Sequence, residues 1–268
     1  MNCPHCQSQN TRELCHKTDL GYSQFYCRAC TKQYNERTGT ALNYISHRTE
    51  VVMYVVHCYL RYKLSLDDVV EMMSMRGFSL CHQTVHNWVQ EFGVTLGIKC
   101  RTQRFGTCGK KWHADATYIK IEGRWCYLYR AIDKEGNLVD VYLSDVRDQA
   151  AAEAFFEQAS KTTGILPTQI TTDKEPALYP AIDNVFGENT KHRDSKYMNN
   201  RIEQDHRGIK SRYKVMKGFK NIFCALIFCT AFEEVRQFFS AKNKTRSERR
   251  GQFMPKFCEM QNLLATAA

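Results

Sequence analysis

The sequence has no long hydrophobic run. Its longest largely apolar stretch, Ile222–Phe232, has 11 residues, whereas a helix needs roughly 20 apolar residues to cross a bilayer. The N-terminus, MNCPHCQSQN, also lacks the basic start and apolar stretch of a secretory signal. We therefore expect a cytoplasmic protein with no membrane partner. With 268 residues, 43% of them hydrophobic, the chain is long enough to bury one large core or two medium ones.

Acidic residues are fewer than basic ones, and they gather in one part of the chain. The formal net charge is +10. Residues 1–110 carry +5, residues 111–187 carry −4 and residues 188–250 carry +9. Basic flanks favour a polyanion such as nucleic acid, and an acidic middle would repel it unless metal ions intervene. The pattern indicates a metal-dependent enzyme acting on phosphates; an unevenly charged, solvated surface is the alternative.

The 13 cysteines are too many, and odd in number, for a simple disulfide framework. Two pairs stand out, Cys3-Pro-His-Cys6 and Cys27-Arg-Ala-Cys30, with 20 residues between them. Two thiolates three residues apart converge on one point, so two such pairs suit tetrahedral Zn²⁺. We predict a zinc ribbon over residues 1–42, in which the metal supplies much of the folding energy. A redox function is the alternative, but the segment lacks a βαβ pattern.

Residues 43–96 predict a helix-turn-helix DNA-binding domain. Apolar spacing indicates helices over 46–62, 66–75 and 81–92, the last ending before Gly93. In the third, recognition helix, Val85, Trp88 and Val89 would pack inward. A plain three-helix bundle is the alternative. The residues that we expect to reach DNA are His82, Gln83, Thr84, His86 and Asn87.

Residues 97–241 change to a mixed pattern that predicts a catalytic domain. Three strands joined by tight turns precede a helix at 149–161, a strand at 169–172, a helix at 175–186, a strand at 190–193 and a helix at 199–213. The order βββαβαβα is that of ribonuclease-H-like folds. The chain is thus predicted to be a multidomain α+β protein: zinc ribbon, helix-turn-helix, ribonuclease-H-like α/β domain, and a basic tail over 242–268.

This topology singles out three acids. Asp115 lies in the first strand, Asp173 ends the fourth strand, and Glu203 lies one turn into the last helix. Converging carboxylates repel one another unless cations lie between them, and oxygen ligands suit Mg²⁺. Two ions roughly 3.5–4 Å apart support phosphoryl transfer. Four other acids are assigned to turns and helix starts or to another helix face: Asp133, Asp145, Asp148 and Asp205.

Three stretches carry a family resemblance: WHADATYIKIEGRWCYLYRAIDKEGNLVDVYL, TTDKEPA and YMNNRIEQDHRGIKSRYKVMKGFKN. They resemble the DDE transposases of the insertion sequence 6 family over roughly Tyr44–Ala241. The family usually has Glu where this chain has Ala116. The resemblance implies that Asp115, Asp173 and Glu203 form the DDE triad. It also implies action on terminal inverted repeats and on target DNA.

The resulting hypothesis is a transposase with two Mg²⁺ (or Mn²⁺) per active site. Water cleaves one strand, and the 3′-hydroxyl released attacks double-stranded target DNA. Because two element ends must be held together, we expect a homodimer. When bound to DNA, it would lie on the prokaryotic nucleoid. His206, Lys210 and Lys174 are expected to contact the DNA backbone. The alternative hypothesis is a decayed or domesticated transposase that acts as a DNA-binding regulator without catalysis. A third hypothesis is a nuclease that acts on RNA–DNA hybrids, but the helix-turn-helix favours duplex DNA instead.

Overall fold

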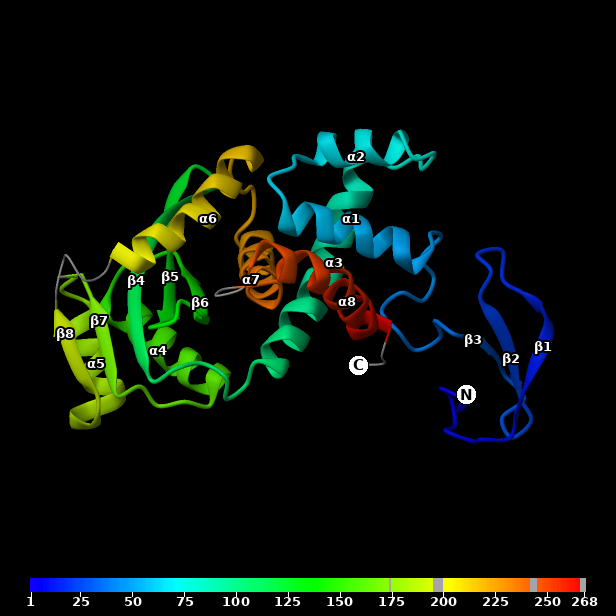
Figure 1. Ribbon diagram of the computed structural model, residues 1–268, viewed down its shortest axis with the longest axis horizontal. Coiled ribbons are helices and arrows are strands. Elements are labelled where there is room, and N and C mark those ends of the chain that lie inside the picture. Colours follow the sequence, from blue (N-terminus) through cyan, green and yellow to red (C-terminus); the bar gives the residue numbers. More distant parts are fainter. Residues whose placement is uncertain (174, 195–199, 242–244, 266–268) are drawn as a thin grey trace. The chain divides into compact units, whose positions relative to one another are not determined.

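The computed structural model describes residues 1–173, 175–194, 200–241 and 245–265. The chain divides into two compact units, one formed by residues 1–56 with 243–268 and the other by residues 57–242 (Figure 1). Within the described residues, no helix combines the length and the apolar character needed to cross a membrane.

The first unit begins with a small antiparallel sheet. Its strands are β1 (Thr11–Lys17), β2 (Ser23–Cys27) and β3 (Gln33–Asn35), in the order β1-β2-β3. Phe25 stacks on the buried Tyr34 with ring centroids 5.4 Å apart. This core is very small, so the sheet needs a further source of stability. The unit also contains the start of α1 (Thr49–Arg61) and helix α8 (Arg246–Ala265).

The predicted helix-turn-helix is formed by α2 (Leu66–Ser74) and α3 (His82–Gln103). Ser65 caps α2 with a reciprocal capping box to Asp68. The predicted end of the recognition helix before Gly93 is wrong, because α3 continues to Gln103. A Cβ at Gly93 would lie 3.3 Å from the Cβ of Ala231 on α7 (Ile222–Phe238), so this glycine permits close helix packing instead of ending a helix. The predicted domain boundary between residues 96 and 97 falls within α3.

The second unit is built around a five-stranded mixed sheet of order β6-β5-β4-β7-β8. Neighbours β6, β5 and β4 are antiparallel, whereas β4, β7 and β8 are parallel. With the helices between them, this is the ribonuclease-H-like arrangement that the sequence predicts. The strands are β4 (Lys111–Ile121), β5 (Arg124–Asp133), β6 (Leu138–Ser144), β7 (Gln169–Thr172) and β8 (Lys191–Asp194).

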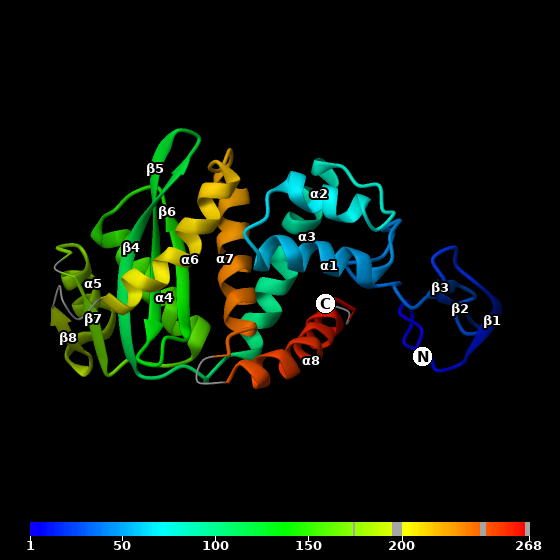
Figure 2. The ribbon, with the colours of Figure 1, turned by 45° about the horizontal axis from the view of Figure 1, so that its top comes forward.

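Helices cover both faces of this sheet (Figures 1 and 2). On one face, α4 (Gln149–Thr163) and α5 (Leu178–Phe186) enclose the main apolar core together with Ala114 and Ala116 of β4. Across the other face runs α6 (Asn200–Met216), which packs on β4 and β5. A short 3₁₀ turn, η1 (Gly187–Asn189), follows α5. The predicted start of α5 at Glu175 is wrong, because Pro176 disfavours helical backbone at the residue before it.

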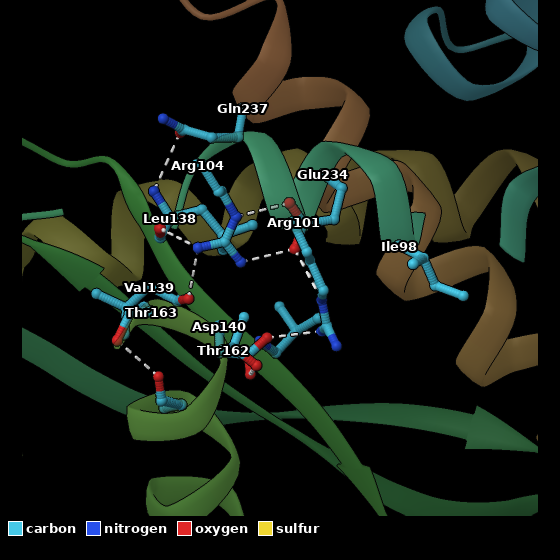
Figure 3. Close-up of polar contacts among 12 residues, drawn as sticks. Ile98, Arg101, Arg104, Leu138, Val139, Asp140, Thr162, Thr163, Glu234 and Gln237 are labelled. Atoms are coloured by element: carbon cyan, nitrogen blue, oxygen red, sulfur yellow. Dashed lines mark hydrogen bonds and ion pairs between the residues drawn. The ribbon is translucent and has the colours of Figure 1, made fainter. Parts of the chain in front are cut away.

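A buried ion cluster joins α3 to the sheet and to α7 (Figure 3). Glu234 of α7 is fully buried and accepts hydrogen bonds from Arg101 of α3 and from Arg104, which follows this helix, the shortest of 2.6 Å. Arg101 also donates to buried Asp140 of β6 at 2.6 Å, and Arg104 donates to the carbonyl oxygen of Val139 at 2.9 Å. Helix α3 is therefore fixed to the sheet by charge-assisted bonds.

This cluster predicts a large loss of stability on Glu234→Ala. Removing one acid leaves two guanidinium groups short of a buried partner, which costs about 3–5 kcal/mol of unfolding free energy. Urea unfolding followed by circular dichroism measures this. Glu157→Ala, which removes the exposed pair with Lys161, is the matched control and should cost under about 1 kcal/mol. Similar losses in the two variants would contradict the role of the cluster.

Candidate active site

The register of the sheet brings Asp115 and Asp173 to the same level. Strands β4 and β7 are parallel, and His113 lies opposite Thr171. Asp115 and Asp173 each come two residues later, at the point where β7 ends at Thr172. Adjacent strands lie about 4.8 Å apart. The two predicted acids therefore meet at the carboxyl end of β7, beside the central strand.

Helix α6 carries the third acid towards this point. Glu203 is an exposed residue of its first turn. One turn further on, His206 is buried, with its Nδ1 3.6 Å from Oδ2 of Asp115. Residues three apart share a helix face, so Glu203 lies on the side of α6 that faces Asp115. Lys210, one turn beyond, is exposed. Lys174 lies outside the described residues.

The electrostatics of Asp115 reflect this gathering of acids. Burial and the negative charge of Asp173 raise the pKa of Asp115 to about 7. The backbone N–H of Ala116 and the charge of Arg147 oppose this rise, and Glu203 adds a smaller increase. A carboxyl group that is hard to ionise beside two other acids favours a bound cation. The site thus has the electrostatic character of a metal centre.

The donor set also fits hard divalent cations. Oδ1 of Asp173 is buried and has no hydrogen-bond partner in the described part of the chain. An unpaired buried carboxylate oxygen costs free energy unless something else binds it, and carboxylate oxygens are the ligands that Mg²⁺ prefers. Among the described residues, the four N-terminal cysteines are the only group of three or more side chains whose metal-ligand atoms all lie within 4.8 Å of one another, so the three acids form a wider group than the thiols do.

His206 is placed behind Asp115, away from the surface. Its side chain is 3% exposed, and burial, with the positive charge of Arg130 second, lowers its pKa to about 3. The imidazole is therefore neutral at physiological pH. At 3.6 Å the contact is longer than a hydrogen bond, so the neutral ring packs beside the carboxyl group of Asp115. The expected contact of His206 with the DNA backbone stays a prediction.

An ion cluster that sequence reasoning missed anchors α6. Arg130 lies opposite Asp115 in the β4–β5 ladder and is fully buried. Its Nη2 donates to Asp205 of α6 at 2.6 Å and to Glu233 of α7 at 2.7 Å. Burial tends to raise the pKa of Asp205, but Arg130 and Arg236 lower it overall. Because Asp205 is bound in this way, the turn that carries Glu203 is fixed against the sheet.

A signal for Arg130 was present in the sequence. The stretch Leu128-Tyr129-Arg130-Ala131-Ile132 places one charge in an otherwise apolar strand. Buried charges occur where they are paired, so an arginine in such a strand predicts an acidic partner from another element. The partner itself cannot be read from the sequence, because Asp205 and Glu233 are distant along the chain.

The predicted DNA-reading residues lie on the first turns of α3. His82 is paired with Asp67, and Nε2 of Gln83 donates to Asn87 at 2.6 Å. Val85, Trp88 and Val89 are buried as the sequence predicts. The helix therefore exposes a polar face at its start. The exposed members of the set are His82, Gln83 and Asn87, and the half-buried ones are Thr84 and His86.

The four predicted zinc ligands are brought together in the first unit. The sulfur atoms of Cys3 and Cys30, and those of Cys6 and Cys27, are each 3.6 Å apart, and all four lie within 4.8 Å of one another. The backbone N–H of Cys30 lowers the pKa of Cys27 to about 7, although burial opposes this. A thiol that ionises near neutral pH is ready to bind a metal ion.

Comparison with known proteins places these features in a family. The model of a family described as "DDE domain" matches residues 109–242. The transposase for the insertion sequence-like element IS431mec of Staphylococcus aureus is 39% identical over 190 residues, covering 67% of this chain and 84% of the relative. The Staphylococcus aureus transposase for element IS257 in transposon Tn4003 matches with the same identity and coverage.

Among solved structures, the HTLV-2 integrase catalytic core domain in complex with magnesium, in its dimeric form, aligns with a TM-score of 0.40 at 20% identity. The alignment covers 53% of this chain and 97% of that one. The simian T-cell lymphotropic virus intasome in complex with a PP2A regulatory subunit aligns with a TM-score of 0.39 at 13% identity, over 66% of each chain.

Sheet order and family model together define the class, a polynucleotidyl transferase with a ribonuclease-H-like catalytic core. Within that class, the chain belongs to the DDE transposases of insertion sequences, in the insertion sequence 6 family.

The anchoring cluster predicts a local effect of Asp205→Asn on α6. The substitution removes a charged acceptor from Arg130 and should cost about 2 kcal/mol of unfolding free energy. Hydrogen–deuterium exchange should rise by about tenfold or more in the first turns of α6, with little change in α4. Asp67→Asn, at an exposed ion pair, is the control. Exchange that rises equally in α4 and α6 would show that Asp205 does not anchor α6 specifically.

Proposed function

We propose that this transposase binds the terminal inverted repeats of its insertion sequence, cleaves a strand at each end and joins it to target DNA. Asp115, Asp173 and Glu203 are proposed to hold two divalent ions, Mg²⁺ or Mn²⁺. The observation that carries the proposal is the buried Asp115, whose pKa is raised by burial and by Asp173 and Glu203. Such a group of acids is unfavourable unless it binds cations.

The three acids act together in this proposal. Asp115, Asp173 and Glu203 would together hold the ions through their carboxylate oxygens. The ions would stabilise the negative charge that develops on the attacking and leaving oxygens. His206 packs beside Asp115, and the Arg130–Asp205 pair holds the turn of Glu203 against the sheet. The nucleophiles are water and the DNA 3′-hydroxyl, so no serine or tyrosine nucleophile is required.

The DNA is proposed to lie on the basic parts of the chain. The start of α3 would read the element end in the major groove, and Lys210 and Lys174 would contact phosphates. The IS431mec and IS257 relatives are transposases of insertion sequences, which supports the same substrate class here. Two ends must be held for joining, so we propose a homodimer. A protein with this activity works where bacterial DNA lies, on the nucleoid in the cytoplasm.

We further propose that Cys3, Cys6, Cys27 and Cys30 hold a structural Zn²⁺. The four sulfur atoms already converge, and the apolar core of the sheet is too small to stabilise it alone. The metal would fix the end of β2 at Cys27 and the two turns that carry the cysteine pairs. A stable ribbon, which precedes the helix-turn-helix in the sequence, would add to recognition of the element end.

Asp115→Asn and Glu203→Gln are expected to abolish strand transfer. The assay combines purified protein, a short duplex with the element's own end, supercoiled plasmid and Mg²⁺. Loss of one metal ligand removes several kcal/mol of transition-state stabilisation, so joined product should fall at least about a hundredfold. Asp183→Asn, an exposed aspartate of α5, is the control and should join normally.

The strand-transfer assay, combined with a gel shift, decides between a transposase and a DNA-binding regulator. Binding of the element end in the gel shift, without nicking or joining by the wild-type protein, would support the regulator. Joining at the wild-type rate by Asp115→Asn would exclude the proposed mechanism.

Zinc content gives a separate prediction for the first unit. The wild-type protein should contain about one Zn²⁺ per chain by atomic absorption, and Cys27→Ser should lose it together with the ordered ribbon. Cys15→Ser changes an exposed cysteine outside the cluster and should retain the metal. Metal-free wild-type protein with an intact ribbon would overturn the assignment.

A further inference from the structure

The β4–β5 hairpin carries an exposed group of aromatic and basic side chains that the proposed function does not use. Cross-strand partners Tyr118 and Tyr127, and Lys120 and Trp125, lie on one face of the hairpin. Trp125 is 60% exposed and Tyr118 50% exposed. Neighbouring large aromatic side chains left in water mark an interaction surface. The hairpin patch is defined here as Tyr118, Lys120, Trp125, Tyr127 and Arg147.

The rings of the hairpin patch are held in fixed positions. The centroid of Tyr118 lies 6.2 Å from that of Trp125 and 5.4 Å from that of Tyr127. Cations flank the rings: Nζ of Lys120 is 5.8 Å from the centroid of Trp125, and Cζ of Arg147 is 5.4 Å from that of Tyr118. Nη1 of Arg147 also donates to the Tyr118 hydroxyl at 2.6 Å. The patch combines aromatic faces with positive charge on a rigid support.

The hairpin patch adjoins the proposed metal centre. Tyr118 follows Asp115 by three residues on β4, so the two side chains point to opposite faces of the sheet. Arg147 links the two: it is bound to Tyr118 and paired with Glu175, two residues after Asp173, and its charge acts on Asp115. Tyr213 and Phe219 contact the edge of β4 beyond β7, so a strand that leaves the acids would reach the rings by passing Arg147.

We propose that the hairpin patch binds unpaired bases of the DNA strand beside the cleaved phosphate, with a base stacked on Trp125. This inference rests on the proposed function. Bases within a duplex are already stacked on their neighbours, so only unpaired bases present a free face to an aromatic ring. Lys120 and Arg147 flank the rings with positive charge, so the patch suits a partner that is anionic as well as aromatic. Single-stranded nucleic acid has both properties.

Tryptophan fluorescence provides a direct test. Of the three tryptophans, Trp88 is 5% exposed and Trp112 is fully buried, so a stacked base would quench Trp125 alone. The full chain is titrated without added Mg²⁺, with an oligodeoxythymidylate of about ten nucleotides and with a duplex of equal length. We expect quenching by the single strand and much less by the duplex. Trp125→Phe should lose the quenching.

Affinity is measured separately, by anisotropy of the labelled single strand. Trp125→Ala should weaken binding roughly tenfold, because a base loses its stacking partner. Trp125→Phe keeps an aromatic face and should bind as the wild type does. The matched control is Phe105→Ala: Phe105 is 61% exposed and lies beside Gly164 at the other end of α4. It should leave affinity unchanged.

The outcomes separate this proposal from the proposed function. If quenching persists in Trp125→Phe, or if Trp125→Ala binds the single strand as tightly as the wild type, the hairpin patch is not a base-stacking surface. Equal quenching by duplex and single strand would also overturn it. If the wild type shows the expected quenching but joins no DNA in Mg²⁺, the patch assignment stands and the proposed catalysis fails. If the wild type joins DNA normally but Trp125 is neither quenched nor needed for binding, the proposed catalysis stands and the patch assignment fails.

Discussion

The buried guanidinium of Arg130 is the interaction on which the catalytic unit depends. It lies in the sheet opposite Asp115 and binds Asp205 of α6 and Glu233 of α7. An unpaired charge at this depth would be very costly, so both helices must lie where their acids meet it. This pairing also affects the proposed metal centre, because Glu203 lies on α6 two residues before Asp205. The position of the third acid is thus set by a charge that takes no part in binding metal.

Much of this architecture follows from patterns in the sequence. Alternating residues and tight turns indicate β4, β5 and β6, and a short apolar strand indicates β7, so the topology and the family motif together single out Asp115, Asp173 and Glu203. The parts that sequence reasoning missed depend on contacts between distant segments. Gly93 is typical of a helix end, yet here it gives α3 close contact with Ala231 of α7. Nothing local to Gly93 shows that a helix from the other end of the chain will pack there.

The same limit applies to the candidate site. The register that aligns Asp115 with Asp173 is predictable once β4 and β7 are known to be adjacent and parallel. The orientation of His206 cannot be predicted in this way, because its spacing from Glu203 equally suits a surface contact with DNA. The structure shows where the ring lies: at 3% exposure, with a pKa lowered to about 3 by burial and Arg130, it is a neutral neighbour of Asp115. Burial is a property of the packed α6–sheet interface, and a single helix does not determine it.

The two faces of β4 explain why one strand can serve two purposes. Asp115 and Thr117 point towards α6, where the acids and the buried arginine lie, whereas Ala116 and Tyr118 point towards α4. Ala116 belongs to the apolar core on that side. The side chain at this position, where the family usually has Glu, therefore does not face the three acids. Arg147, bound to Tyr118 and Glu175, links the two sides, because Glu175 follows Asp173 by two residues and Tyr118 belongs to the hairpin patch. Beyond the end of β7, the hydroxyl of Tyr213 and Phe219 contact the edge of β4. The proposed DNA strand would therefore pass from the carboxylates to the rings by way of Arg147.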